Sequence, residues 1–284
     1  MPSETHHIHI NLNLDSPVAI LQRAIQRIIY LVSGALASST DTVDDPLLLP
    51  EVGIQANFDP SLKWSPIQVR TELKTWILQN GFRDAVESLS VFLEESHKIS
   101  SAWALIKRQE SGDQLTGADL SSLQESDPKT FHRLGLPDKF GHFRDSHGIL
   151  VDPQLLKNIL SVNTARNCLV HRGGIVGEKD SINNILEVTW RRLKLIAIDS
   201  LGEHELQMGV VYPEGATIAL KLVEESKIFN IGESIIFTAQ EFQNIVWSLF
   251  MFSNDFKATL IEWGKANGFP ISTQPGACHE SQPN

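Results

Sequence analysis

The side chains best suited to chemistry gather in residues 163–174, Asn-Thr-Ala-Arg-Asn-Cys-Leu-Val-His-Arg-Gly-Gly. This stretch contains Arg166, Asn167 and His171, with Arg172 directly after the histidine. An imidazole, with an ordinary pKa near about 6.5, can accept or donate a proton close to neutral pH. A guanidinium stays charged and presents a planar fork that fits phosphate oxygens. These residue types therefore suit proton transfer beside a phosphate group.

A helix over 152–172 is expected to position these side chains. Asp152 can cap its first turn, and Pro153 suits the first helical position. The apolar residues that recur at helical spacing are Leu155, Leu156, Ile159, Leu160 and Val162. Gly173 and Gly174 supply the stop. The side chains capable of chemistry should therefore lie in the last turns of this helix.

The pattern Arg-Asn-x-x-x-His at 166–171 resembles the signature of the HEPN superfamily. Its members are small helical-bundle proteins, many of them metal-independent endoribonucleases or toxins. In that family the motif lies on a late helix, and dimerisation brings two copies together into one site. The resemblance implies that Arg166, Asn167 and His171 are catalytic, that RNA is the substrate and that no cofactor or metal is needed. It also implies a homodimer, with an antitoxin-like protein as a candidate partner.

The motif residues can be given roles in RNA cleavage, because the 2′-hydroxyl of RNA attacks the adjacent phosphorus without a metal. Neutral His171 can take the 2′-hydroxyl proton or donate one to the leaving 5′-oxygen. Arg166 can stabilise the phosphorane oxygens, and Asn167 can orient His171 or bond the phosphate or ribose. At about 100° per residue, Arg166 and His171 lie about 140° apart around the helix, whereas Asn167 and His171 share a face. One histidine cannot easily be both acid and base, so a second His171 from a dimer partner is expected.

Two other interpretations of the motif stay open. Arg166, His171 and Arg172 would also stabilise a helix C-terminus by complementing its dipole, without any catalytic role. A non-catalytic binding or scaffold module for RNA, a nucleotide or a protein would keep the bundle and use the motif for structure or ligand binding. The chain contains no GxxxxGK[ST], HExxH, CxxC or GxSxG sequence, so P-loop hydrolysis, zincin chemistry, dithiol redox and an α/β-hydrolase nucleophile lack support.

The net charge of −10 argues against nucleic-acid binding, because phosphate contacts come from Lys and Arg. The segment 166–194 differs from the rest of the chain. Its six basic residues are Arg166, Arg172, Lys179, Arg191, Arg192 and Lys194, and its three acidic residues are Glu178, Asp180 and Glu187. Within this basic segment, Arg172 is expected to contact RNA.

The composition indicates a globular domain able to bury a large core, with 284 residues of which 42% are hydrophobic. No apolar run reaches the roughly 18 residues of a membrane span, and the first residues lack a secretion-signal pattern. The two cysteines, Cys168 and Cys278, imply no disulfide framework and fit a reducing cytoplasm. We expect one mainly α, HEPN-like bundle over 1–268, elaborated by a small antiparallel sheet within 183–237 (α+β overall), and a disordered tail over 269–284.

The remaining pattern predicts the other elements of this bundle. The expected helices cover 17–33 (ending at Gly34), 66–109 (one helix, or two with a bend at Gly81) and 239–267 (opened by a Thr238–Glu241 capping box). The expected strands cover 7–14, 186–198, 216–223 and 227–237. Residues 38–64 are expected to be a long loop. Residues 111–150 are expected to be a polar connector with short helices at 118–123 and 128–134.

Two groups of histidines could bind ligands. His7 and His9 would lie on one face of the N-terminal strand, but no nearby Cys or acidic ligand completes a metal site, so a polar solvent face is favoured. The second group lies in the 111–150 connector and comprises His132, His142 and His147, with Arg133, Lys139 and Arg144. Catalytic or RNA-contacting roles are open for it, but its spacing fits no metal motif and a solvated loop is favoured.

Overall fold

A computed structural model describes residues 12–38, 65–113, 131–199, 202–206, 212 and 217–269, and the backbone of two short strands. These strands, β1 (Leu48–Leu49) and β2 (Ile54–Gln55), form an antiparallel pair inside the segment expected to be a loop. The other predictions for 38–64 lie outside the described residues. So do the predicted helix at 118–123, most of the strand at 7–14 and most of the tail. Of the helix predicted at 128–134, residues 128–130 are outside the described part, and residues 132–134 form a turn and bend, so a helix over 132–134 is wrong.

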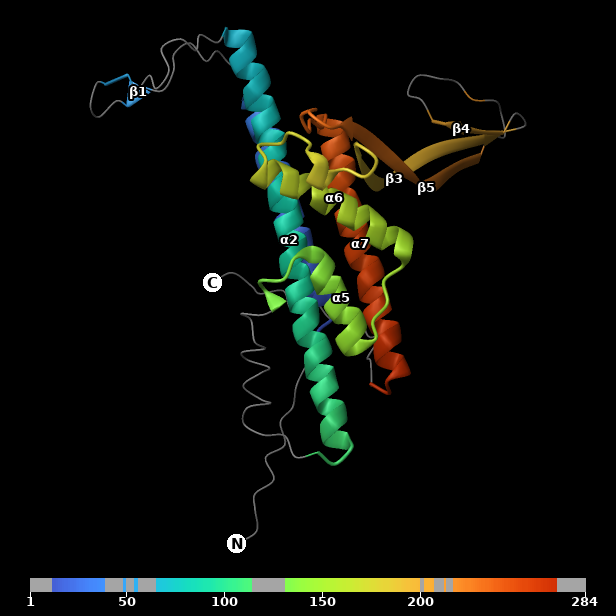
Figure 1. The fold of residues 1–284 in the computed structure, drawn as a ribbon. Coiled ribbons are helices and arrows are strands. Elements are labelled where there is room, and N and C mark those ends of the chain that lie inside the picture. The colour runs from blue at the N-terminus through green and yellow to red at the C-terminus, as the bar shows by residue number, and fades with distance from the viewer. Residues whose placement is uncertain are drawn as a thin grey trace, which may run out of the picture.

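The other described elements form a helical bundle with a small three-stranded sheet (Figure 1). The helices are α1 (Asp15–Ser38), α2 (Pro66–Glu110), α5 (Leu136–His147), α6 (Pro153–His171) and α7 (Ala239–Ala266), with a short 3-10 turn, η1 (Glu178–Asp180). The strands β3 (Ile185–Asp199), β4 (Gly202–Glu205) and β5 (Thr217–Asn230) form an antiparallel sheet in the order β4-β3-β5. The predicted mainly α fold with a small antiparallel sheet is confirmed.

The long helix α2 is the element against which the other helices pack. It is continuous through Gly81, so the bend allowed at that residue does not occur. A Cβ added at Gly81 would lie 2.5 Å from Cγ2 of Val32 on α1 and 3.1 Å from the ring of Phe242 on α7. Gly81 therefore allows three helices to meet closely. The predicted end of the first helix at Gly34 is wrong, because α1 continues to Ser38 and residues beyond Gly34 pack on the core.

The C-terminal helix α7 supplies one side of the core, and it begins as the sequence predicts. Thr238 Oγ1 accepts from the Glu241 backbone N–H at 3.1 Å, and Glu241 accepts from the Thr238 N–H at 2.7 Å, which forms the predicted capping box. The buried face of α7 is largely the predicted one, comprising Phe242, Ile245, Val246, Leu249, Phe252, Phe256 and Leu260. Past the helix, Phe269 stacks on Trp103 of α2, with ring centroids 5.1 Å apart.

The sheet has a packed base and a projecting end. Val188 and Trp190, near the start of β3, are buried against the helices, whereas Leu193 and Leu195 further along the strand are exposed. Figure 1 shows the distal part of β3 and β5 extending away from the bundle together with β4. The prediction of two separate strands at 216–223 and 227–237 is wrong, because β5 pairs with β3 without interruption to Asn230. Pairing with β3 provides hydrogen-bond partners for the backbone N–H and C=O groups of the polar residues between the two predicted strands.

The polar connector expected over 111–150 contains a helix that the sequence did not predict. Helix α5 has Pro137 in its first turn and ends at Gly148, which adopts a left-handed conformation with φ of 69°. Leu136, Phe140 and Phe143 recur at helical spacing and are buried in the core. The helix was missed because the glycines and prolines around it indicate turns.

Candidate functional site

The motif lies in the last two turns of α6, as the sequence predicts. Asp152 accepts hydrogen bonds from the backbone N–H groups of Gln154 and Leu155, at 2.9 and 3.0 Å, and so fixes the start of the helix. At the other end, Gly173 and Gly174 have φ values of 61° and 78° and terminate the helix after His171. Both helix signals in the sequence are confirmed.

Arg166 is held in place by two neighbours. Its guanidinium forms an ion pair with Glu87 of α2, and Nη1 donates to Oδ1 of Asn167 at 3.0 Å. Its side chain remains 23% exposed, and that of Glu87 is 54% exposed. Burial and the nearby charge of Arg83 lower the pKa of Arg166 below its ordinary value. A second cation on α2 therefore lies close to the motif arginine.

His171 ends α6 as an exposed side chain, with no hydrogen bond or ion pair to any other described residue. Asn167 is bonded to Arg166 and does not orient the imidazole. Within the described residues no hydrogen bond joins Arg166 to His171, consistent with their separation around the helix. The structure therefore presents a free imidazole and a braced guanidinium on neighbouring turns.

Arg172 is engaged inside the protein, where the sequence suggested contact with RNA. Its Nε donates to Oδ2 of Asp180 at 2.6 Å, and its Nη2 pairs with the other carboxylate oxygen. The Asp180 side chain is fully buried, and it also accepts from the Gly177 N–H at 3.0 Å. This forked pair closes the loop that follows α6.

Cys168, in the middle of the motif, cannot act as a nucleophile in this state. Its side chain is buried, and Sγ donates to the carbonyl oxygen of Ile175 at 3.1 Å. Burial, together with the charge of Asp180, raises the pKa of the Cys168 thiol to about 11. The thiol is therefore protonated near neutral pH and packs as a small apolar group.

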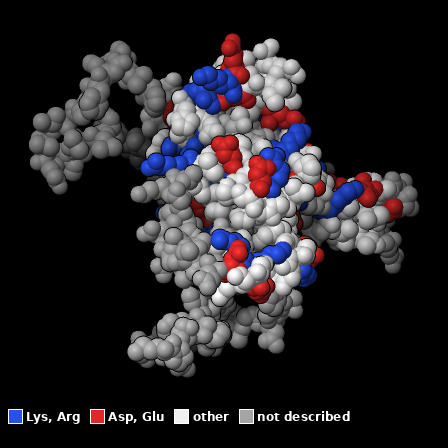
Figure 2. Space-filling view, turned by 60° about the horizontal axis from the view of Figure 1, so that its bottom comes forward, with Lys and Arg blue, Asp and Glu red and all other residues white. Residues whose placement is uncertain are grey.

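The basic segment 166–194 is largely neutralised by acidic residues from elsewhere in the chain. Its ion pairs are Arg166–Glu87, Arg172–Asp180, Arg191–Asp255, Arg192–Glu205, Arg192–Glu225 and Lys194–Glu205. Lys179 is the one basic residue of this segment without such a partner in the described ranges. Figure 2 shows positive and negative side chains intermixed over the face it displays. The local excess of positive charge counted along the sequence therefore does not persist in the fold.

Arg83 and Glu87 belong to the motif's surroundings, but no pattern in the sequence singles them out. They are four residues apart on α2 and therefore share one helix face. Only the packing of α2 against α6 brings that face to Arg166, and no local pattern in the sequence encodes this approach.

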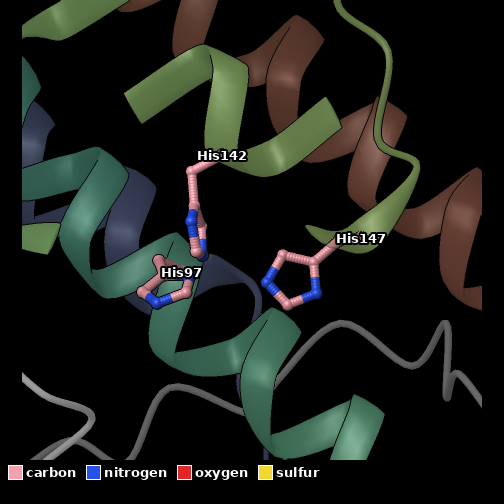
Figure 3. Close-up of side chains that lie close together, drawn as sticks. All are labelled: His97, His142 and His147. Atoms are coloured by element: carbon pink, nitrogen blue, oxygen red, sulfur yellow. The ribbon is translucent and has the colours of Figure 1, made fainter. Parts of the chain in front are cut away.

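A second cluster contradicts the expectation that the connector histidines lie in a solvated loop. His97 of α2 meets His142 and His147 of α5, and one nitrogen of each ring lies within 4.8 Å of the others (Figure 3). All three side chains are half-buried. His132 instead bonds Glu94 at 3.1 Å and lies outside the cluster.

Comparison with protein-family models, with curated proteins and with solved structures finds no match for this chain. Among the residues that the structure describes, no helix combines the length and apolar character needed to cross a membrane.

Proposed function

We propose that the protein is a HEPN-like, metal-independent endoribonuclease that acts on cytoplasmic RNA as a homodimer. The observation that supports this best is the free, exposed imidazole of His171 at the end of α6, one turn beyond a partly exposed Arg166. A proton-transfer group needs access to substrate, and an imidazole used only for packing would be buried or bonded.

Arg166 keeps donors for a phosphate although it is already paired. A guanidinium has five N–H donors, and the contacts to Glu87 and Asn167 involve Nη2 and Nη1. Because Glu87 is mostly exposed, an RNA phosphate can share Arg166 with it or displace it at modest cost. In this proposal, Glu87 and Asn167 hold the guanidinium in position to meet the charge that develops on the phosphorane.

The proposed dimer supplies the second proton-transfer group. With one His171 per chain, one imidazole accepts the 2′-hydroxyl proton while its counterpart from the partner protonates the leaving 5′-oxygen. A two-fold axis near the end of α6 would bring both copies of Arg166 and His171 to one phosphodiester. An antitoxin-like protein that covers this surface would inhibit cleavage.

A non-catalytic binding or scaffold module is the second candidate, and the ion pairs around the motif favour it. Four arginines of the basic segment are matched to carboxylates, so little free positive charge is left for a polyanion. In this alternative, Arg166 braces α6 against α2, and His171 complements the negative end of the helix dipole.

The test is cleavage of a fluorescently labelled single-stranded RNA by full-length protein in EDTA, with the matching DNA as a negative substrate. His171→Ala and Arg166→Ala should each lower cleavage by about 100- to 10,000-fold, as expected for loss of a proton-transfer or charge-stabilising group. His204→Ala and Arg27→Ala, purified in the same way, are the matched controls and should retain wild-type activity. Activity per chain should also rise with protein concentration, because the proposed site needs two chains.

Cleavage that survives in both motif variants would come from a contaminant or another site and would overturn the proposal. An inactive wild-type protein that remains monomeric at high concentration in light scattering would favour the binding module.

A further inference from the structure

Three histidines from α2 and α5 bring their rings together at one place. Figure 3 shows the rings of His142 and His147 directed from α5 toward the ring of His97 on α2. The ring centroids are 4.7 Å apart for His97 and His142, and 5.5 Å apart for His97 and His147. Within the described ranges, no other three groups of ligand type approach one another this closely.

The surroundings restrain the ring of His97 and the backbone of His147. His97 stacks on Phe131, with centroids 4.1 Å apart and planes inclined by 17°. The backbone carbonyl of His147 accepts from Trp263 Nε1 at 2.6 Å, which anchors the last turn of α5 to α7. Preorganised ligands bind a metal more tightly, because less side-chain freedom is lost on binding.

One nitrogen in the cluster lacks the partner that a buried polar atom requires. Nε2 of His147 is inaccessible to solvent and has no hydrogen-bond partner among the described residues. A buried unsatisfied nitrogen destabilises the fold, so its retention calls for an explanation such as an ion. For His142, Ser146 Oγ lies 3.4 Å from Nδ1, which leaves the other ring nitrogen available as a ligand.

The imidazoles are also in the state that a metal requires. Burial, with a contribution from His142, lowers the pKa of His147 to about 4, and burial with both neighbouring histidines lowers that of His97 to about 3. Burial lowers the pKa of His142 as well, although Asp145 opposes the shift. All three rings are therefore neutral near pH 7 and offer lone pairs without losing a proton.

From this geometry we infer that His97, His142 and His147 bind one divalent transition-metal ion of the zinc class, cross-linking α2 and α5. Neutral imidazole suits Zn²⁺, Ni²⁺ and Cu²⁺ rather than Mg²⁺ or Ca²⁺, which prefer oxygen ligands. Three protein ligands leave a fourth tetrahedral position, which a water molecule can occupy.

The movement needed to close the site is small. Ligands at about 2.0–2.1 Å from zinc in a tetrahedron lie about 3.4 Å from one another, so nitrogens within 4.8 Å must each move inward by about 0.8 Å at most. Small changes in ring torsion provide this displacement.

Two surface pockets reach the edge of the histidine cluster. His142 and Ser146 line a pocket of about 700 Å³ beside α5 and α6, and His147 and Ser146 line a second pocket of about 370 Å³ beside α2 and α7.

The site is independent of the proposed ribonuclease function. His97 is ten residues beyond Glu87 on α2, or about 15 Å along the helix axis, so the metal lies away from the Arg166 motif.

The test is zinc binding by full-length protein prepared without an affinity tag and stripped with a chelator. Titration calorimetry should give one Zn²⁺ per chain, and bound Co²⁺ should show the visible absorption of a four-coordinate site. His142→Gln and His97→Gln should weaken Zn²⁺ binding by more than the roughly 10- to 100-fold that loss of a supporting residue costs, since each removes a direct ligand. His132→Gln, at a neighbouring exposed histidine outside the cluster, is the matched control and should bind as wild type does.

Two further measurements test whether zinc binds at these three histidines. His7 and His9 are replaced by Gln in one variant, which should retain stoichiometric zinc; loss of the ion there would place the site at the N-terminus and overturn the assignment. X-ray absorption of the zinc-loaded wild type requires no variant to fold and should show three imidazole nitrogens at about 2.0–2.1 Å. Absence of stoichiometric binding, or equal binding by wild type and a folded His142→Gln variant, would mean that the three rings only pack together.

Discussion

Replacement of Arg172 by alanine tests whether this arginine serves structure or RNA binding. The change removes both donors to Asp180, whose carboxylate is fully buried and would keep only the Gly177 N–H and the Cys168 thiol beside it. Breaking a buried ion pair by removing one partner costs about 3–5 kcal/mol. Because the Arg172 side chain is itself 30% exposed, we expect the lower end of that range, about 3 kcal/mol.

Urea unfolding followed by circular dichroism measures this loss. With a denaturant slope of about 1–3 kcal/mol per molar, a loss of about 3 kcal/mol lowers the unfolding midpoint by about 1–3 M. His171→Ala is the control one residue away and should change stability by no more than about 0.5 kcal/mol, because its side chain is exposed and unbonded. Replacing the pair with Arg172→Met and Asp180→Leu together should recover much of the loss, since no buried charge is left unpaired.

An Arg172→Ala midpoint equal to that of His171→Ala would refute the structural assignment. It would mean that Asp180 is hydrated in solution and that the guanidinium is free to contact a phosphate. RNA affinity would then have to fall in Arg172→Ala, measured on protein that remains folded.

Three more outcomes are expected. Burial raises the pKa of Glu94, but hydrogen bonds from Lys139 and His132 outweigh burial and set the net pKa below the ordinary 4.5. The stabilising contribution of this carboxylate is lost as pH falls through the lowered pKa, so the stability advantage of wild type over Glu94→Gln should shrink as pH falls below the ordinary 4.5 in urea titrations. Gly81→Ala should cost about 1–3 kcal/mol by overpacking against Val32, seen as a lower melting temperature, and an unchanged value would mean that α1 moves away freely. Cys168 should resist iodoacetamide in the folded protein and react after unfolding, as read by peptide mass spectrometry; rapid labelling of folded protein would show that the thiol is accessible.

The sequence predicted those parts of the fold that local signals determine. Helix α6 follows from the cap at Asp152 and the glycines after His171, and α7 follows from the box at Thr238 and its apolar stripe. Helix α5 was missed because only its apolar residues indicate a helix, whereas its flanking prolines and glycines indicate turns. The break placed within β5 was wrong because pairing with β3 overrides the preference of a polar stretch.

The surroundings of the motif could not be predicted, because they depend on which helices meet. The prediction that Arg166, Asn167 and His171 lie at the end of a helix is confirmed. The partner of Arg166, however, lies on α2, and the partner of Arg172 lies in the short turn after α6. Counting charges along a segment suggested a basic surface, whereas ion pairs form between residues distant in sequence. Net charge along a segment is therefore a weak guide to the surface potential of this fold.

The histidine cluster was missed for a different reason, which concerns helix geometry. His142 and His147 are five residues apart, a spacing that places side chains about 140° from one another on a regular helix. His147 is the last residue of α5, directly before the left-handed Gly148, so its ring occupies the end of the helix and not a fixed face. The third member, His97, belongs to a helix forty-five residues earlier in the chain. Residue spacing within a single helix therefore does not reveal such a site.

One face of α2 carries polar residues at helical spacing and connects the Arg166 motif with the histidine cluster. The apolar face of the same helix does not indicate these positions. On α2, residues 87, 90, 94, 97 and 101 recur at spacings of three and four, which keeps them on one face. Glu87 pairs with Arg166, and both Ser90 and Glu94 accept hydrogen bonds from Lys139. His97 meets the α5 histidines, and Ser101 lies against His97. Lys139 is only 1% exposed, whereas Glu87 is 54% exposed, so this polar face runs from the surface into the contact between α2 and α5. On α2, polar residues at helical spacing therefore mark positions where neighbouring helices bring polar groups, and these positions lie beside both candidate sites.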